Sequence, residues 1–230
     1  MCGRYTLTDP GTLLDDLSVE HSDGVGLTPR YNIAPTQHAP VVRVDPEREV
    51  RAVTHLRWGL IPSWAKDPSI GNRMINARAE TVAEKPSFRS AFKRRRCLVL
   101  TDGFYEWTKT PDGKQPHHIH RAGRAPFVLA GLWEHWNKGP EGPIDSYTIL
   151  TTQANDQVSA LHHRMPVILD ADAWDLWLDP GVSAREVLEA LLVPYAGASP
   201  LEHVAVSRRV NRPANDDPEV LTPIAEDAAS

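Results

Sequence analysis

The stretch CLVLTDGFYEW (residues 97–107) decides the fold. Its apolar run ends at the turn residues Asp102 and Gly103 and resumes as an aromatic strand, which is typical of β-structure. The turns TPDGK and AGR then separate the strand-like runs HHIHR and APFVLAGLWEHW, so residues 97–136 predict an antiparallel meander. We therefore expect β-sheet at the centre of the molecule.

Further strand-like runs lie on both sides of this stretch. APVVRV (39–44) and EVRAVTHLRW (49–58) flank DPER and predict a hairpin, and DSYTILTT (145–152) adds a strand. Helices are expected over 85–95, where two phenylalanines lie at helical spacing, and over 171–178 and 182–192. The 20 prolines suit short strands and irregular loops better than a helical bundle. The pattern indicates the α+β class.

Length and composition set the scale of the molecule. A chain of 230 residues with 41% hydrophobic residues can bury one full core, so we expect a single domain over 1–230. The tail from about 213 to 230 carries five acids and no base, and is expected to be loosely packed. The chain shows neither a signal-peptide pattern nor an apolar run of spanning length, so we expect a cytoplasmic monomer with no membrane contact.

The charge is unevenly distributed along the chain. The net charge is -5, but residues 51–101 hold eleven Lys and Arg against three acids, a local balance of +8 that leaves -13 for the remainder. A segregated basic stretch can bind a polyanion even on an acidic protein. The alternative is a solvated helix face, particularly for FKRRR at 92–96.

Cys2 directly follows Met1 and is one of two cysteines in the chain. If Met1 is removed, the α-amine of Cys2 has a pKa of about 7.7 to 8.0, so roughly a tenth of it is neutral at pH 7. That amine can form an imine with an aldehyde, and the adjacent thiol can then close a thiazolidine ring. If Met1 stays, Cys2 is an ordinary thiol. Cys97, inside CLVL, is expected to be buried in the core.

Two motifs offer acid-base groups. On a strand, Glu106 of DGFYEW shares a face with Phe104, so its carboxylate is either paired or raised in pKa, unless that face is solvated. LHHRMP (161–166) places His162, His163 and Arg164 at an element boundary, where histidine titrates near neutrality. Adjacent histidines point in different directions, so we expect one of them to act.

HHIH (117–120) lacks a third ligand spaced to complete a zinc site, so neither a metal nor a cofactor is expected.

Two further motifs offer groups that can bind a ligand. INARAE (75–80) presents Asn76 and Arg78 on one face if it is extended. WGLIPSW (58–64) carries two tryptophans around a proline, which can stack on bases or simply cap the core.

Seven motifs in order give the chain a family resemblance. Met-Cys-Gly-Arg, RYNIAPTQ (30–37), WGLIPSW, NARAET (76–81), PSFRSAFKRRRCL (86–98), DGFYEW and HHRMP together resemble the SOS-response-associated peptidase (SRAP) family, from residue 2 to the segment 206–219. The resemblance implies antiparallel strands curled into a pseudo-barrel with peripheral helices. It also implies recognition of abasic sites in single-stranded DNA and a covalent crosslink through the N-terminal cysteine, because an abasic deoxyribose opens to an aldehyde.

The resemblance also implies roles for particular residues. Cys2 would form the crosslink, Asn76 would orient its amine or the sugar oxygen, Glu106 would act as acid-base, and His162 would assist imine chemistry. The residues expected to touch DNA are Arg4, Arg78 and Arg164 on phosphates with Thr151 nearby, and Pro35 and Trp64 against the bases. His163 stands where the family more usually has an acidic or amide residue.

Two alternatives stay open. The first is a cysteine-type peptidase that uses Cys2, Glu106 and His162, with hydrolysis of its own N-terminus as one activity. The second is a module that binds single-stranded DNA without a covalent step. The expected partner is single-stranded DNA containing abasic sites, and replication-fork proteins stay open as further partners.

Overall fold

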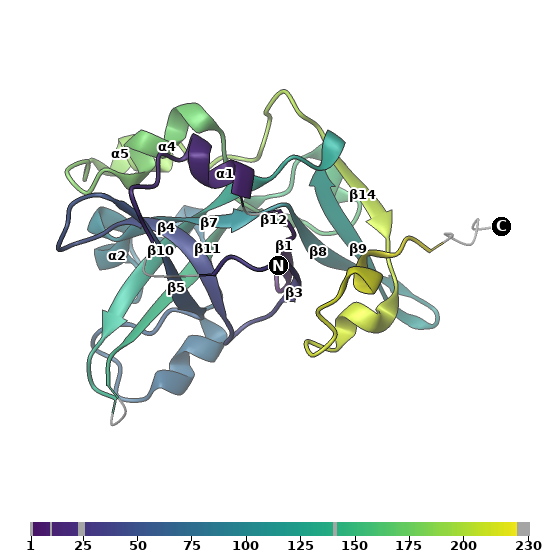
Figure 1. Ribbon diagram of the computed structural model, residues 1–230, viewed down its shortest axis with the longest axis horizontal. Helices are drawn as coiled ribbons and strands as arrows, with labels where there is room; N and C mark the ends of the chain where they lie inside the picture. Colours follow the sequence, from purple (N-terminus) through teal and green to yellow (C-terminus); the bar gives the residue numbers. More distant parts are fainter. Residues whose placement is uncertain (1, 10, 23–25, 140–141, 225–230) are drawn as a thin grey trace.

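The computed structural model describes residues 2–9, 11–22, 26–139 and 142–224. One half of the molecule is a closed barrel (Figure 1), with strands in the order β5 (Arg51–Trp58), β4 (His38–Val44), β7 (Arg96–Thr101), β10 (Phe127–Trp136) and β11 (Ile144–Gln153). Neighbouring strands pair antiparallel, and β11 closes the ring by pairing parallel with β5. The predicted hairpin over 39–58 and the predicted α+β pseudo-barrel are both confirmed.

Aromatic side chains fill one region of the core. Trp58 and Tyr147 are fully buried and stack with their ring centroids 6.3 Å apart, while Tyr5 meets the Trp58 ring edge-on at 5.2 Å. The hydroxyls of Tyr5 and Tyr147 share a hydrogen bond of 2.6 Å, which satisfies both inside the core. Strand β1 is thereby fastened to the barrel.

A second sheet stands beside the barrel, with strands in the order β14 (Leu201–Ala205), β9 (Gly113–Arg121), β8 (Gly103–Thr110), β1 (Tyr5–Leu7) and β3 (Arg30–Ile33). The predicted meander over 97–136 is therefore wrong in two of its three connections. Of the consecutive strands only β8 and β9 pair with each other, while β7 pairs with β10 in the barrel. The chain changes sheet at Asp102, whose buried carboxylate accepts hydrogen bonds from the hydroxyls of Thr6 and Thr8. These contacts turn the chain toward β1.

Short helices lie on the periphery, as predicted (Figure 1). They are α1 (Gly11–Asp16), α2 (Arg89–Arg94), α3 (Asp156–Ser159), α4 (Ala171–Leu178) and α5 (Arg185–Glu189), with 3-10 turns η1 (Pro68–Arg73), η2 (Ala79–Thr81), η3 (Ala122–Arg124), η4 (Arg208–Asn211) and η5 (Pro218–Leu221). The remaining strands are β2 (His21–Ser22), β6 (Asn76–Arg78), β12 (Arg164–Pro166) and β13 (Ile168–Leu169). In the described part of the chain, none of the helices has the length and apolar character needed to cross a membrane.

Part of the basic cluster at 92–96 serves the fold. Arg96 is buried and donates to five backbone carbonyls, among them those of Trp177 at 2.6 Å and Val182 at 3.0 Å. Arg95 pairs with Glu134 at 2.8 Å. These two arginines tie α2 and the loop after α4 to the barrel, which leaves Lys93 and Arg94 as the exposed cations of the cluster.

The acidic tail is packed over the part that the structure describes, contrary to expectation. Asp216 accepts hydrogen bonds from the backbone N–H groups of Tyr31 and Asn32 at 2.5 and 2.8 Å and pairs with Arg30, and Val220 is fully buried. Asp216 caps the backbone of β3, whereas Asp217 and Glu219 pair with Arg209, and composition alone does not reveal these contacts. Residues 225–230 lie outside the described residues.

Candidate functional site

Strand pairing brings the N-terminus to Glu106. Tyr5 pairs with Phe104, and the N–H of Tyr105 donates to the carbonyl of Arg4 at 3.0 Å. Continued by one step, this antiparallel register sets Glu106 beside residues 2 and 3. The carboxyl is 3% exposed, and burial raises its pKa above the ordinary glutamate value.

Cys2 is fully buried in the chain that carries Met1. Burial raises the pKa of its thiol well above the usual range, and the negative charge of Glu106 raises it further. The amide Nδ2 of Asn76 donates to the Cys2 carbonyl at 2.8 Å. Asn76 comes from β6, which pairs with β11, so the barrel wall fixes the backbone of Cys2.

A pocket of about 430 Å³ opens next to Glu106. It is lined by Arg4, Glu106, Trp107, Lys114, His162 and Asn211. The structure thus brings together three of the residues expected from sequence, Arg4, Glu106 and His162, and adds three that were not expected. Trp107 and Lys114 belong to the β8–β9 hairpin, and Asn211 ends η4.

His162 is held in a defined orientation. Its Nδ1 accepts a hydrogen bond of 2.9 Å from the backbone N–H of Arg164. The same Nδ1 lies 3.2 Å from the Arg164 carbonyl, and the shorter contact with the N–H favours the neutral tautomer that carries its proton on Nε2. Burial lowers the pKa of His162, which favours this neutral form. The His163 ring stacks on it with centroids 4.3 Å apart, and the charge of His162 lowers the pKa of His163.

Arg164 and Thr151 are engaged inside the protein. The Arg164 guanidinium binds both carboxylate oxygens of Glu80, at 2.6 and 3.0 Å, and the Thr151 carbonyl at 2.6 Å. Thr151 is fully buried, and its hydroxyl lies within 3.4 Å of the Ala77 carbonyl. In this arrangement both residues connect β11, β12 and η2, and neither presents a free group to a strand of DNA.

The other residues expected to contact DNA are more accessible. Arg78 is exposed, Trp64 is 53% exposed and Pro35 is half-buried. Arg4 is half-buried, and its Nη1 donates to Oδ1 of Asn32 at 3.0 Å and to the Val210 carbonyl at 2.6 Å.

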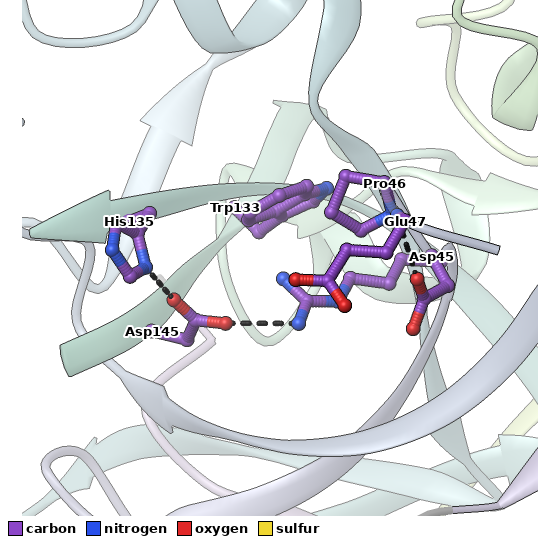
Figure 2. Close-up of a pocket in the computed structure, with 7 residues that line it drawn as sticks. Asp45, Pro46, Glu47, Trp133, His135 and Asp145 are labelled. Carbon is purple, nitrogen blue, oxygen red and sulfur yellow. Dashed lines mark hydrogen bonds and ion pairs between the residues drawn. The ribbon is translucent and has the colours of Figure 1, made fainter. Parts of the chain in front are cut away.

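A second pocket, of about 400 Å³, is formed by other parts of the barrel (Figure 2). The Arg43 guanidinium lies 4.1 Å from the centroid of the Trp133 ring and binds Asp145 at 2.8 Å. The other oxygen of Asp145 binds Nδ1 of His135 at 2.7 Å. None of the residues expected from sequence to be functional lines this pocket.

The histidines of HHIH serve the second sheet. His118 and His120 share a strand face with ring centroids 5.5 Å apart, and burial lowers the pKa of His118 to about 3. His118 is hydrogen-bonded to the Thr6 hydroxyl at 3.1 Å. Among the residues that the structure describes, no group of three His, Cys, Asp or Glu is placed to hold a metal ion.

Comparison with known proteins agrees with the motifs. The family model described as SOS response associated peptidase (SRAP) matches residues 1–213. The Bacillus subtilis protein named abasic site processing protein YoqW is 40% identical over 224 residues, which are 96% of this chain and 99% of the relative. The Gallus gallus protein named abasic site processing protein HMCES is 38% identical over 231 residues, 85% of this chain and 66% of the relative.

Solved structures share the fold. A crystal structure of a protein from Bacteroides thetaiotaomicron has a TM-score of 0.85 at 25% identity and covers 97% of this chain and 100% of its own. A protein from Bordetella bronchiseptica has a TM-score of 0.73 at 27% identity, with 90% and 100% covered. From the motifs, the fold and these relatives together, the chain belongs to the SOS response associated peptidase (SRAP) family.

Proposed function

We propose that this protein processes abasic sites in single-stranded DNA by trapping them covalently through Cys2 after Met1 has been removed. The observation that carries the proposal is the placement of a buried carboxyl of raised pKa, Glu106, beside the second residue of the chain. The names of the relatives support abasic-site DNA as the substrate class.

The proposed reaction loses one water. The open-chain abasic sugar carries an aldehyde, and the neutral amine of Cys2 adds to its carbon to give a carbinolamine. Protonation of the hydroxyl releases water and leaves an imine. The Cys2 sulfur then adds to the imine carbon while the thiol proton passes to the nitrogen, which closes the thiazolidine.

Each neighbouring group has a place in this sequence. Glu106, whose raised pKa keeps more of it protonated, gives its proton to the departing hydroxyl and takes back the proton that the nitrogen loses as the imine forms. Nε2–H of neutral His162 donates to the sugar oxygen. Asn76 holds the Cys2 carbonyl through Nδ2, and its Oδ1, which is buried and accepts no hydrogen bond from the described residues, would accept one from the new amine.

The DNA contacts follow from what is accessible. Arg4 and Arg78 are the arginines that we expect on phosphates, and the exposed Trp64 would stack or wedge beside the lesion with Pro35. Arg164 would bind a phosphate only if the phosphate replaced Glu80 as its ion-pair partner. Until that exchange occurs, Arg164 and Thr151 act by holding the backbone that orients His162.

A general cysteine peptidase is less well supported by the site. Such an enzyme needs a thiolate, and burial of Cys2 beside Glu106 raises the thiol pKa and disfavours that form. Imine chemistry needs no thiolate at its first step, because the amine is the nucleophile.

The test uses single-stranded oligonucleotides that differ only at one position. One carries an abasic site, one carries a tetrahydrofuran analogue that has no aldehyde, and one is undamaged. We expect a complex that survives denaturing electrophoresis with the first oligonucleotide alone. Complexes of equal yield with all three would contradict the aldehyde chemistry, and the absence of any complex would contradict the proposed function.

A further inference from the structure

The segment 207–217, here called the C-terminal segment, forms part of the pocket wall. Within it, the carbonyls of Val210 and Arg212 accept hydrogen bonds from Nδ2 of Asn32 at 3.1 and 3.0 Å. Asn32 is fully buried, and Nη1 of Arg4 reaches both Asn32 and the Val210 carbonyl. The C-terminal segment and Arg4 are thus positioned by one shared set of hydrogen bonds.

Asn211 is the residue that this segment contributes to the pocket. Its Oδ1 accepts a hydrogen bond of 2.8 Å from Nε1 of Trp107. An indole nitrogen can only donate, so this bond turns the amide oxygen toward Trp107 and directs the NH₂ group away from the indole. Asn211 is exposed, which leaves its two N–H donors accessible at the pocket.

The pocket needs donors of this kind. An abasic nucleotide offers no base to read, so its recognition depends on sugar and phosphate oxygens. Arg164, expected from sequence to bind a phosphate, is occupied by Glu80 and the Thr151 carbonyl. The lining residues that can donate to an anionic oxygen are Arg4, Lys114 and Asn211, with His162 as a further neutral donor.

We propose that Asn211 donates a hydrogen bond to a phosphate oxygen beside the abasic sugar, and that Trp107 acts as a positioning residue that orients the Asn211 amide. This inference rests on the proposed function, since it takes abasic single-stranded DNA as the ligand. It adds a DNA contact from the C-terminal segment, next to the acid-base groups of the site.

The first test measures affinity without chemistry. Fluorescence anisotropy with the tetrahydrofuran oligonucleotide is compared for wild type, Asn211→Ala and Asn211→Asp. Losing one hydrogen bond to a charged group should weaken binding by about tenfold. Asn211→Asp retains an acceptor for the Trp107 indole but replaces the donor with a negative charge, so we expect it to weaken binding more than Asn211→Ala.

Asn215→Ala is the matched control. Asn215 lies in the same segment and its amide donates to the Arg209 carbonyl at 2.8 Å, but it does not line the pocket. We expect its affinity to equal that of wild type. Wild-type affinity for both Asn211 variants, with an unchanged melting temperature, would overturn the assignment.

The second test isolates Trp107. If Trp107 acts through Asn211, Trp107→Phe should weaken binding in the wild-type background and have no further effect in Asn211→Ala. Fully additive effects would overturn the positioning role.

Wild-type protein that neither crosslinks nor binds abasic DNA would contradict the proposed function. Unaltered binding by the Asn211 variants beside an active wild type would contradict this inference alone.

Discussion

Two pockets of the molecule are similar in volume, about 430 Å³ beside Glu106 and about 400 Å³ beside Arg43, but differ in how their charged groups are paired. Beside Arg43 the charges form a connected set in which Asp145 binds both Arg43 and His135 (Figure 2). Beside Glu106 a buried carboxyl and a buried thiol each have a raised pKa.

This difference distinguishes charged groups that stabilise the fold from groups that can take part in proton transfer. The Asp145 carboxylate bridges Arg43 of β4 and His135 of β10, so this set of charges joins strands of the barrel. Burial disfavours the charged form of the Glu106 carboxyl and raises its pKa, so its acid form is available for proton transfer to higher pH than in an ordinary glutamate. The volume of a pocket therefore says less about function than the pairing and burial of the ionisable groups that line it or lie behind it.

The largest expected effect comes from Cys2 itself. Cys2→Ala removes the thiol that completes the ring, and Cys2→Ser replaces it with a poorer nucleophile whose ring hydrolyses readily. We expect no adduct from Cys2→Ala, and from Cys2→Ser none that survives prolonged incubation in denaturing buffer. Cys97→Ala is the control, because Cys97 is the other buried thiol and lies in the barrel. Adduct formation by Cys2→Ala at the wild-type rate would show that the Cys2 thiol is not needed, and it would contradict the assignment of the chemistry to the pocket beside Glu106.

The next effect concerns Glu106, which would supply the proton. Glu106→Gln should slow crosslinking by about 10²- to 10⁴-fold, the range of a positioned acid-base, and should leave affinity for undamaged single-stranded DNA near that of wild type. His135→Ala in the second pocket should leave the crosslinking rate unchanged. Single-turnover time courses measure both. Equal rates for Glu106→Gln and wild type would make Glu106 a structural residue.

The effect of Glu106→Gln on the crosslinking rate should depend on pH. The raised pKa of Glu106 means that its acid form persists to higher pH than in an ordinary glutamate, and that it is lost as pH rises through that value. The ratio of the wild-type rate to the Glu106→Gln rate should therefore be largest at low pH and fall as pH rises. Dividing the two profiles removes the titration of the Cys2 amine, which both proteins share. A ratio that does not change with pH would contradict a role in proton donation.

In the second pocket we expect a smaller effect, on stability rather than on the crosslinking rate. Asp145→Asn removes the negative charge that faces Arg43, whose Nε and Nη1 are already buried without a hydrogen-bond partner among the described residues. Because Asp145 is partly exposed, we expect a loss of about 1 to 2 kcal/mol in the free energy of unfolding. Urea denaturation measures this, and the crosslinking rate below the transition should be unaltered. A crosslinking defect without a stability defect would mean that the second pocket takes part in the reaction.

The smallest effect separates the two adjacent histidines. His162 lines the pocket and is oriented by the Arg164 N–H, whereas His163 stacks on its ring. His162→Ala should slow crosslinking or its reversal, and His163→Ala should change either rate by a few-fold at most. The same time courses decide between them, and a larger defect in His163→Ala would exchange the roles of the two residues.

Strand alternation is a local property, so the sequence could indicate which side chains of a strand face the interior. The face of Glu106 follows from the aromatic pattern of DGFYEW, and the burial of Cys97 from CLVL. The change of sheet at Asp102 could not be predicted in the same way. It depends on hydrogen bonds from Thr6 and Thr8, more than ninety residues earlier in the chain.

Long-range pairing also explains what the sequence missed in the site. The sequence motif does not indicate a partner for Arg164, but in the fold its guanidinium forms an ion pair with Glu80. Asn211 lies in an irregular segment with no periodicity, and its place depends on Trp107 and on the carbonyl contacts of Asn32. The tail is expected from composition to be loosely packed, because composition does not show that Asp216 caps the backbone of β3.

The most direct test of the account is mass spectrometry of the crosslinked peptide, with and without borohydride. We predict that the adduct lies on an N-terminal Cys2 with Met1 absent, that its mass is that of peptide plus abasic nucleotide less one water, and that borohydride leaves it unchanged because a thiazolidine has no imine to reduce. An adduct on a chain that retains Met1, an adduct on another residue, or a gain of two hydrogens on reduction would contradict it.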